Sequence, residues 1–373
     1  MNFKVEGKTF QQQLQAVSKV INSKNTISIF DNFLIRLEGD RMSITGSDQE
    51  NMLTAYMDVL ESSGDGLIAV NARRLLEITK EIDNQPIEFD VNDDTKEINL
   101  RFLNGHFTFM GVDGNDYPDL RQTAENCNVL IIPVDMALKG INNTIYAAST
   151  DNNRPVMAGI YWDIHNDDIT FVSSDTHKLA RYINREKAPG VESSFILPLK
   201  SCMILRSLIG KDDADLKITY DEKGGVFEVG DYILSTLFVT GRYPNYNRVI
   251  PTDSPFEMTI DRVSLINAMR RVTLFSSKSS NLVVFEISAD SLHLSSQDLD
   301  YGTSAEEVVT CSYQGNPMTI GFNGAFMIEI LSNIADDTVI FRFSDPARPA
   351  ISSPFEQKEG EDLVIIQMPM QVL

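Results

Sequence analysis

The sequence predicts an α+β protein made of three copies of one domain, each with antiparallel sheets and two helices. The first observation is a strand pair that recurs with a closing Asp, in NFLIRLEGDRMSITGSD, AGIYWDIHNDDITFVSSD and LVVFEISADSLHLSSQD. The closing residues Asp48, Asp175 and Asp298 are 127 and 123 residues apart. The second observation is the length, because 373 residues suit two or three domains. A period this long exceeds the unit of a solenoid, so each copy has the size of a domain.

Each copy is predicted to begin with a strand that one helix follows, and to contain a second helix further on. Leu14, Leu138 and Leu265 mark the first helix, in QQQLQAVSKVI, DMALKGINNTI and VSLINAMRRVTLF. The second helix lies in NARRLLEITKEI, PLKSCMILRSLI and NGAFMIEILSNI, which align through Asn71, Pro198 and Asn323. Apolar residues recur there at i, i+3 and i+7, on one face of an amphipathic helix: Leu75, Ile78, Ile82, Cys202, Leu205, Ile209, Met327, Ile330 and Ile334.

The rest of each copy is predicted to form strands separated by turns, such as DGNDYP and EKGG. A Tyr-Pro turn recurs in DYPDL and RYPNY, 126 residues apart. We therefore expect domains at 1–125, 126–253 and 254–373.

Charge is unevenly distributed along the chain. The net charge of −21 taken alone disfavours nucleic acid as a partner. Basic residues nevertheless gather on and just after the predicted helices, whereas acidic residues crowd the turns between strands. If the helices share one side of the assembly, that side is far less negative than the other; the alternative is a set of ordinary solvated helix faces. The basic residues are Lys19, Lys24, Arg73, Arg74, Lys139, Lys200, Arg206, Arg270 and Arg271.

Signals for export, cofactors and catalysis are not found in the sequence. The N-terminal MNFKVEGKTF has no apolar signal region, and no run approaches the roughly 20 apolar residues of a membrane helix, so we expect a cytoplasmic protein. Three widely spaced cysteines favour neither a disulfide framework nor a zinc site. The four histidines form no metal-ligand spacing, and no GxSxG elbow is present. We expect no metal, no cofactor and no catalytic residues.

Two segments stand out as candidates for binding. The apolar segment LVIIQMPMQVL, Leu363 to Leu373, must pack on something, either as an edge strand that completes the last sheet or as the wall of a groove for apolar ligands. The segment SSDTHKLARY places His177 two residues after Asp175, which hints at acid–base chemistry but lacks a nucleophile or a metal.

Several motifs resemble those of the bacterial DNA polymerase III beta subunits, the sliding clamps. They are SSDTHKLARY, GRYPNYNRVIP, IGFNGAF, QMPMQVL, RPVMAGIYW and NTISIFDNFLI, and the resemblance runs from end to end. It implies a processivity factor for DNA replication, in which two head-to-tail copies close a ring around duplex DNA. Twelve helices would line the hole and the antiparallel sheets would form the outer wall. The protein would tether the polymerase and would not itself be an enzyme.

The resemblance also implies the residues that face DNA and the joint between copies. Lys24, Arg73, Arg74 and Lys200 would face the phosphates of double-stranded DNA without reading its sequence. At the homodimer joint, GHFTFMG would pair with TSAEEVVTCSY of the second copy. The apolar residues expected at that joint are Phe107, Phe109, Leu274 and Phe275.

A peptide-binding cleft is implied as well. It would receive a short Gln- and Leu/Phe-containing segment of the polymerase alpha subunit, the clamp loader or other partners. Thr176 stands where many relatives have Gly, Lys178 where many have Arg, and Ser280 where some have an aromatic residue, which leaves the peptide preference open. The cleft residues would be Met157, Ser174, Thr176, His177, Lys178, Leu179, Pro244, Arg248, Val249, Asn323, Phe326, Pro349, Ile366, Met368, Pro369 and Met370.

Two other classes of protein remain open at this stage. One is a noncatalytic adaptor that never meets DNA, which retention on circular but not linear DNA would exclude. The other is an enzyme with a site across repeats around Asp175 and His177, in which His177→Gln would abolish turnover.

Overall fold

The computed structural model describes residues 1–373 except 83, 119–126, 152, 211–213 and 373. The chain forms two compact units: unit 1 comprises Met1–Val134 and Met203–Phe238, and unit 2 comprises Asp135–Cys202 and Val239–Leu373. The expected domain boundary between residues 125 and 126 lies outside the described residues. The three domain ranges stay a prediction.

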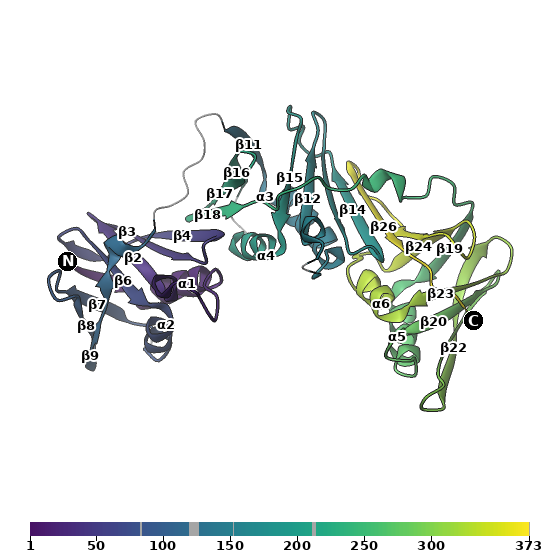
Figure 1. Cartoon of the computed structure of the whole chain (residues 1–373), viewed down its shortest axis with the longest axis horizontal. Coiled ribbons are helices and arrows are strands. Elements are labelled where there is room, and N and C mark those ends of the chain that lie inside the picture. The colour runs from purple at the N-terminus through teal and green to yellow at the C-terminus, as the bar shows by residue number, and fades with distance from the viewer. Residues whose placement is uncertain (83, 119–126, 152, 211–213, 373) are drawn as a thin grey trace. The chain divides into compact units, whose positions relative to one another are not determined.

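Unit 1 contains two antiparallel sheets (Figure 1). Strand β4 of the first repeat pairs with β18 of the second, Leu53 opposite Leu234, so one sheet runs through strands of both repeats. The five-stranded sheet has the order β5 (Glu61–Ser63), β1 (Asn2–Glu6), β7 (Pro86–Val91), β8 (Glu97–Phe102), β9 (Gly105–Met110). The nine-stranded sheet has the order β10 (Val112–Asp113), β6 (Gly66–Asn71), β2 (Asn32–Glu38), β3 (Arg41–Ser47), β4 (Asn51–Asp58), β18 (Tyr232–Leu237), β17 (Gly224–Val229), β16 (Asp215–Tyr220), β11 (Asn128–Pro133).

Unit 2 is built on one twelve-stranded antiparallel arrangement. Strand β14 pairs with β26, Leu179 opposite Ile366, which joins the second repeat to the third (Figure 1). The order is β15 (Ser193–Pro198), β12 (Gly159–Ile164), β13 (Ile169–Ser174), β14 (Lys178–Asn184), β26 (Glu361–Gln367), β25 (Ala350–Pro354), β24 (Thr338–Phe343), β19 (Phe256–Asp261), β22 (Thr303–Gln314), β21 (Ser291–Asp298), β20 (Leu282–Ile287), β23 (Met318–Asn323).

The helices confirm the predicted pattern of an opening and a following helix in each repeat. Asn71 and Asn323 cap the following helices of the first and third repeats, because their side-chain oxygens accept the N–H of Arg74 at 3.0 Å and of Phe326 at 3.1 Å. The opening helices are α1 (Gly7–Ser18), α3 (Val134–Thr144) and α5 (Arg262–Thr273), and the following helices are α2 (Ala72–Lys80), α4 (Leu199–Leu208) and α6 (Gly324–Ser332). The 3₁₀ helices are η1 (Ser28–Asp31), η2 (Gly114–Asp116), η3 (Ile145–Ala147), η4 (Pro155–Met157) and η5 (Tyr246–Arg248).

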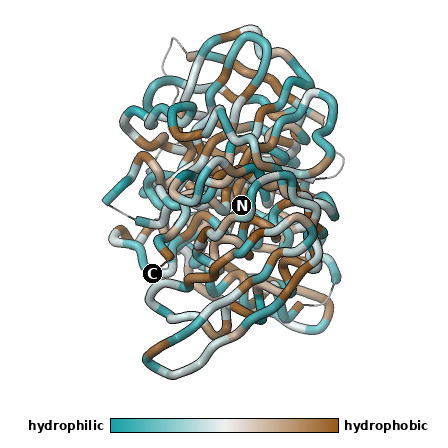
Figure 2. Tube along the Cα trace, turned by 90° about the vertical axis from the view of Figure 1, so that its right-hand side faces the viewer, coloured by the Kyte–Doolittle hydropathy of each residue, from teal (hydrophilic) through white to brown (hydrophobic). Residues whose placement is uncertain are grey.

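The core of each unit forms from alternate strand residues and from one face of each helix. In β2, Phe33, Ile35 and Leu37 are buried while the residues between them are not. Colour along the trace in Figure 2 accordingly changes between hydrophobic and hydrophilic over short distances. The predicted helix faces follow the same rule: Leu75, Cys202, Leu205, Met327, Ile330 and Ile334 are buried, and Ile78, Ile82 and Ile209 are partly buried.

The repeated Asp has the same local role in all three copies. Each carboxylate accepts the backbone N–H groups two and three residues later, which closes an Asx turn at the end of a strand. Asp48 accepts from Glu50 and Asn51, Asp175 from His177 and Lys178, and Asp298 from Asp300 and Tyr301.

The residue two positions before each Asp also has equivalent surroundings. Ser173 Oγ donates to the carbonyl of Thr144 at the end of α3, and Ser296 Oγ donates to Val272 O near the end of α5 at 2.6 Å. In the first repeat the position is Gly46, where an added Cβ would meet the side chain and the carbonyl of Val17 in α1. The repeat therefore extends to individual contacts between helix and strand.

Candidate functional site

An apolar cavity of about 190 Å³ opens in unit 2, and we call it the apolar cleft. It lies where the end of β13, the start of β14 and the segment after β26 meet the residues around η5. The following residues of the predicted peptide site line it: Met157, Ser174, Thr176, His177, Lys178, Leu179, Pro244, Val249, Ile366 and Met368.

Three lining residues were missed by the sequence analysis: Tyr243, Asn245 and Tyr246. The ring of Tyr243 stacks on Tyr161, with the two centroids 4.7 Å apart, and the Tyr246 hydroxyl donates to Asp163 at 2.7 Å. Burial raises the pKa of both lining hydroxyls, so they stay protonated at neutral pH. The segment RYPNY could have indicated these tyrosines, because a Tyr stands on each side of the Pro244-Asn245 pair. The residues that orient the two tyrosines, however, lie far away in the sequence.

The turn after β13 positions the polar end of the cleft. Ser174 Oγ accepts the N–H of Thr176 at 3.1 Å and donates to the carbonyl of Lys178 at 2.9 Å. Thr176 takes a left-handed conformation with φ of +79°, which costs about 1–2 kcal/mol for a residue with a side chain. The Asp175 carboxylate, which holds the next two N–H groups, stabilises this conformation.

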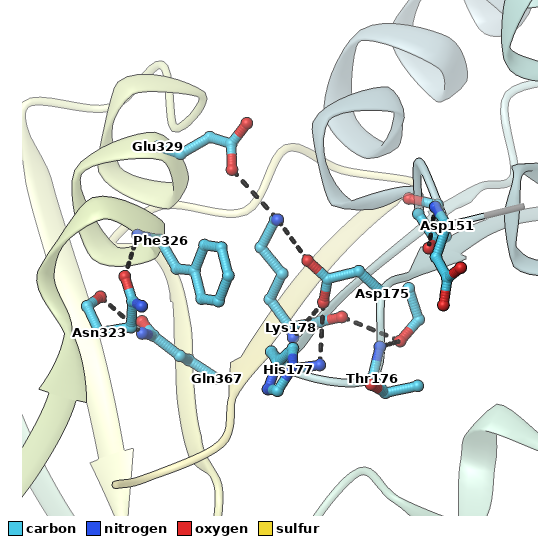
Figure 3. A network of polar contacts seen from close by, with 12 residues as sticks. Asp151, Asp175, Thr176, His177, Lys178, Asn323, Phe326, Glu329 and Gln367 are labelled. Carbon is cyan, nitrogen blue, oxygen red and sulfur yellow. Dashed lines mark hydrogen bonds and ion pairs between the residues drawn. The ribbon is translucent and has the colours of Figure 1, made fainter. Parts of the chain in front are cut away.

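Lys178 carries a buried charge beside the cleft (Figure 3). Its ammonium group lies 2.6 Å from Asp175 and 3.1 Å from Glu329 of α6, and 4.4 Å from the centre of the Phe326 ring. The ring of His177 also stacks on Phe326. Two carboxylates and an aromatic face together offset the cost of removing the ammonium group from water.

A second cavity shares a wall with the apolar cleft, and we call it the polar cavity. It has a volume of about 580 Å³ and contains the predicted cleft residue Phe326. Thr176, His177 and Lys178 line both cavities. The other lining residues are Tyr146, Ala148, Ser149, Thr150, Asp151, Arg154, Asp175 and Glu329.

Within LVIIQMPMQVL, Leu363–Gln367 forms β26, which lies between β14 and β25 rather than at a sheet edge, and the segment after β26 forms part of the cleft wall. The Met368 N–H donates to His177 O at 2.8 Å, and Met368 lines the apolar cleft. Two residues later, the Met370 N–H donates to Gly321 O of β23 at 2.8 Å. A Cβ at Gly321 would lie 2.9 Å from Met370 O, so this close approach requires glycine.

The remaining predicted cleft residues do not line the apolar cleft. Pro369 and Met370 face a third cavity of about 480 Å³ together with Gly321. Asn323 caps α6 and its carbonyl accepts the Gln367 side chain at 3.0 Å. Arg248 is exposed in η5, and Pro349 lies partly buried just before β25.

The residues predicted to face DNA lie on or near helices. Lys24 is exposed after α1, and Arg73 and Arg74 are exposed in the first turn of α2. Arg73 pairs with Glu77 at 3.0 Å, which partly neutralises it. Lys200 is partly buried at the second position of α4.

The strands predicted to join two copies each have an edge without a partner in the described part of the chain. Strand β9 is the last in its sheet; Phe107 on it is 41% exposed, but Phe109 is only 6% exposed and belongs to the core. Residues 303–310 of β22 pair with β21 on one side only. Leu274 is 80% exposed and Phe275 42% exposed just after α5.

Across the described ranges, no group of three or more His, Cys, Asp or Glu side chains is arranged to hold a metal ion. None of the helices in those ranges has the length and apolar character needed to cross a membrane.

Comparison with known proteins accounts for the whole chain. Family models of the DNA polymerase III beta subunit match residues 1–121 as its N-terminal domain, 131–245 as its central domain and 247–371 as its C-terminal domain. The Beta sliding clamp of Bacillus subtilis (strain 168) is 25% identical over 383 residues, covering 100% of this chain and 99% of the relative. The Beta sliding clamp of Pseudomonas aeruginosa is 24% identical over 373 residues, covering 100% of both chains.

Solved structures show the same fold. The beta subunit from Pseudomonas aeruginosa aligns with a TM-score of 0.94 at 24% identity, and the one from Streptococcus pyogenes with a TM-score of 0.94 at 22% identity, each covering 100% of both chains. Since the three family models follow one another along nearly the entire sequence, the chain belongs to the family of DNA polymerase III beta subunits, the sliding clamps of DNA replication.

Proposed function

We propose that two copies of this chain form a closed ring around duplex DNA and tether the replicative polymerase for processive synthesis. The observation that carries the proposal is the match of nearly the entire chain to the three successive domains of the sliding-clamp family. The protein acts in the cytoplasm as a noncatalytic tether and needs no cofactor, because retention on DNA comes from encirclement rather than from a tight site.

DNA is held by charge and without base recognition. Lys24, Arg73, Arg74 and Lys200 contact phosphates, while the net charge of −21 keeps the remaining surface from binding nucleic acid. Three of these side chains are exposed, and Arg73 shares its charge with Glu77. Weak, exchangeable contacts of this kind permit sliding, whereas a strong site would stall the ring.

The ring closes by pairing of exposed strand edges. The free edge of β9 in one copy pairs with residues 303–310 of β22 in the other, and Phe107 contacts Leu274 and Phe275 there. Phe109 supports this joint from within the core rather than by direct contact. Pairing would cover edges that otherwise promote uncontrolled association.

Partners dock a short peptide in the apolar cleft. The aromatic and methionine lining suits the Leu and Phe side chains of a Gln-Leu-x-Leu-Phe type segment in the polymerase alpha subunit, the clamp loader or other clamp-binding proteins. Arg248, Asn323, Phe326, Pro349, Pro369 and Met370 would contact the parts of the peptide that extend beyond the cavity itself.

The decisive experiment measures retention on DNA and polymerase processivity. The protein loaded on primed circular DNA should remain bound and should lengthen the products of a replicative polymerase, and linearising the DNA should release it. Binding that is equal on both DNA forms, or no binding at all, would favour an adaptor that acts without encirclement. Loss of a measured turnover in His177→Gln would instead identify an enzyme.

A further inference from the structure

Thr176 combines an unfavourable backbone with a position between two cavities. The non-glycine residues with positive φ in the described chain are Gln49, Lys96, Thr176 and Asn281. Among them Thr176 is the β-branched residue, for which this conformation is least favourable. Thr176 lines both the apolar cleft and the polar cavity. Strained residues persist where the surrounding structure holds them, and they concentrate at binding sites.

The side chain of Thr176 is fixed in place from the polar side. Arg154 Nη1 donates to Thr176 Oγ1 at 2.9 Å, and Arg154 itself lines the polar cavity. The backbone of Thr176 is held by Ser174, whose hydroxyl accepts the Thr176 N–H at 3.1 Å. Rotation of the Thr176 side chain would break the hydrogen bond from Arg154.

The two cavities that Thr176 lines differ in chemistry. Met157, Leu179 and Met368 give the cleft an apolar lining. Asp151, Asp175 and Glu329 line the polar cavity together with Thr176, and Figure 3 labels all four residues. An apolar anchor that outgrew the cleft would have to displace the threonine side chain and enter charged surroundings.

We propose that Thr176 sets the upper size of the apolar side chain that the cleft accepts, by closing the cleft at its junction with the polar cavity. The inference rests on the proposed peptide-binding function and names a specificity determinant within it. The chemical class selected is a peptide with an aromatic anchor no larger than Phe. A Trp anchor would press against the Thr176 side chain, which the hydrogen bond from Arg154 holds in place, and overpacking of this kind lowers affinity.

The first repeat supplies a matched control for the backbone. Gln49 follows Asp48 as Thr176 follows Asp175, has φ of +85°, and donates its N–H to Ser47 as Thr176 does to Ser174. Gln49 lines neither cavity. The left-handed turn therefore recurs in the first and second repeats but not at Leu299 of the third, and it does not depend on threonine, whereas lining both cavities is particular to Thr176 in this pair.

The test is calorimetric titration of the dimer with two peptides, Gln-Leu-Ser-Leu-Phe and Gln-Leu-Ser-Leu-Trp. Wild type should bind the Phe peptide at least about tenfold more tightly than the Trp peptide. Thr176→Ala and Thr176→Gly should both reduce this ratio below about threefold, mainly by improving binding of the Trp peptide. Thr176→Gly should also melt about 2 °C above Thr176→Ala, because only glycine relieves the positive φ.

Two control variants distinguish the effect of the Thr176 side chain on peptide size from the effects of backbone strain and of changes in the polar cavity. Gln49→Gly should relieve the same backbone strain and leave the Phe/Trp ratio unchanged, and Thr150→Ala should remove a threonine from the polar cavity alone with the same result. An unchanged ratio in both Thr176 variants, with the Phe peptide still bound, would overturn the assignment of Thr176 and leave the cleft standing. Failure of wild type to bind either peptide would instead refute the proposed peptide-binding function.

Discussion

The ammonium group of Lys178 shows how a single residue joins distant parts of unit 2. Asp175 lies three residues away, but Glu329 and Phe326 come from α6, about 150 residues further along the chain. The ion pair with Asp175 is local and follows from the DTHK spacing. The contact with Glu329 depends on the pairing of β14 with β26, which no local pattern encodes.

His165 provides a test of electrostatics at the same scale. Partial burial lowers the pKa of His165, but hydrogen bonding to Glu192 and the charges of Asp163, Asp168 and Glu192 outweigh it, so the pKa is raised. A raised pKa in the folded state means that this histidine stabilises the protein fully below its unfolded pKa of about 6.5, and that the contribution is lost as pH rises through the folded pKa.

We therefore expect His165→Gln to lower the Tm at pH 6 and to leave it close to that of wild type at pH 9. Thermal melts of both proteins at these two pH values measure the difference. Of the carboxylates that face the ring, Glu192 at 3.1 Å is more than half exposed and Asp163 at 3.5 Å is mostly buried, so added salt should weaken mainly the contribution of Glu192. A Tm difference that is the same at both pH values would show that the charge of His165 contributes nothing.

At the scale of the element, the segment after β26 has two anchors with different consequences. Its first anchor, Met368 on His177, forms the cleft, and its second anchor, Met370 on Gly321, covers the open edge of β23. LVIIQMPMQVL therefore divides into an interior strand, up to Gln367, and a following segment that has one residue in the cleft wall and one isolated bridge to β23.

Removing Met368 to Leu373 should separate these roles. If the segment walls the peptide site, the truncated protein should remain a dimer and its affinity for a Gln-Leu-x-Leu-Phe type peptide should fall about tenfold or more, because losing several apolar contacts costs at least about 1.4 kcal/mol. Calorimetry on the truncated dimer measures this. Unchanged affinity with a lower Tm would leave only a structural role for the segment.

Elements with local causes were predictable, and contacts between distant segments were not. The following helices are marked by apolar spacing and by the caps Asn71 and Asn323, which act within three residues. The aromatic lining was missed because Tyr243 is oriented by Tyr161, 82 residues earlier, through stacking that no spacing rule reveals. Phe109 was predicted at the homodimer joint with Phe107; the two residues share one face of β9, but in the single chain Phe109 is 6% exposed and Phe107 41%, a difference that their spacing does not reveal.

At the scale of the whole molecule, assembly depends on residues that a single chain leaves exposed. Changing Phe107 and Leu274 to Asp should give folded monomers, because an unpaired charge in an apolar joint is costly to bury. Sedimentation velocity measures the change in mass. Phe109→Asp is not an equivalent probe, since that side chain is buried within the chain and its replacement should unfold the sheet. A dimer that persists in the double variant would place the joint elsewhere.

Charge reversal tests the contact with DNA. Replacing Lys24, Arg73 and Lys200 with Glu should weaken retention to the same degree on all DNA sequences and should reduce its salt dependence, since each lost phosphate contact removes about 0.9 from the slope of log affinity against log salt. Retention on nicked circles across a salt series measures both. Arg73→Glu should have a smaller single effect than Lys24→Glu, because Glu77 already shares the charge of Arg73. Loss confined to particular sequences would indicate base recognition.

The strand pairs β4 with β18 and β14 with β26 determine how the chain can be divided. Each pair joins the central repeat to a neighbouring repeat by continuous backbone hydrogen bonding. A fragment cut at 126–253 would lose both neighbours and expose the two edges at once, with apolar Leu234 and Leu179 beside them. Exposed strand edges pair with strands of other molecules, so the isolated central repeat should aggregate under conditions in which the intact chain does not. Expression of this repeat would therefore succeed only when a flanking repeat is kept on each side.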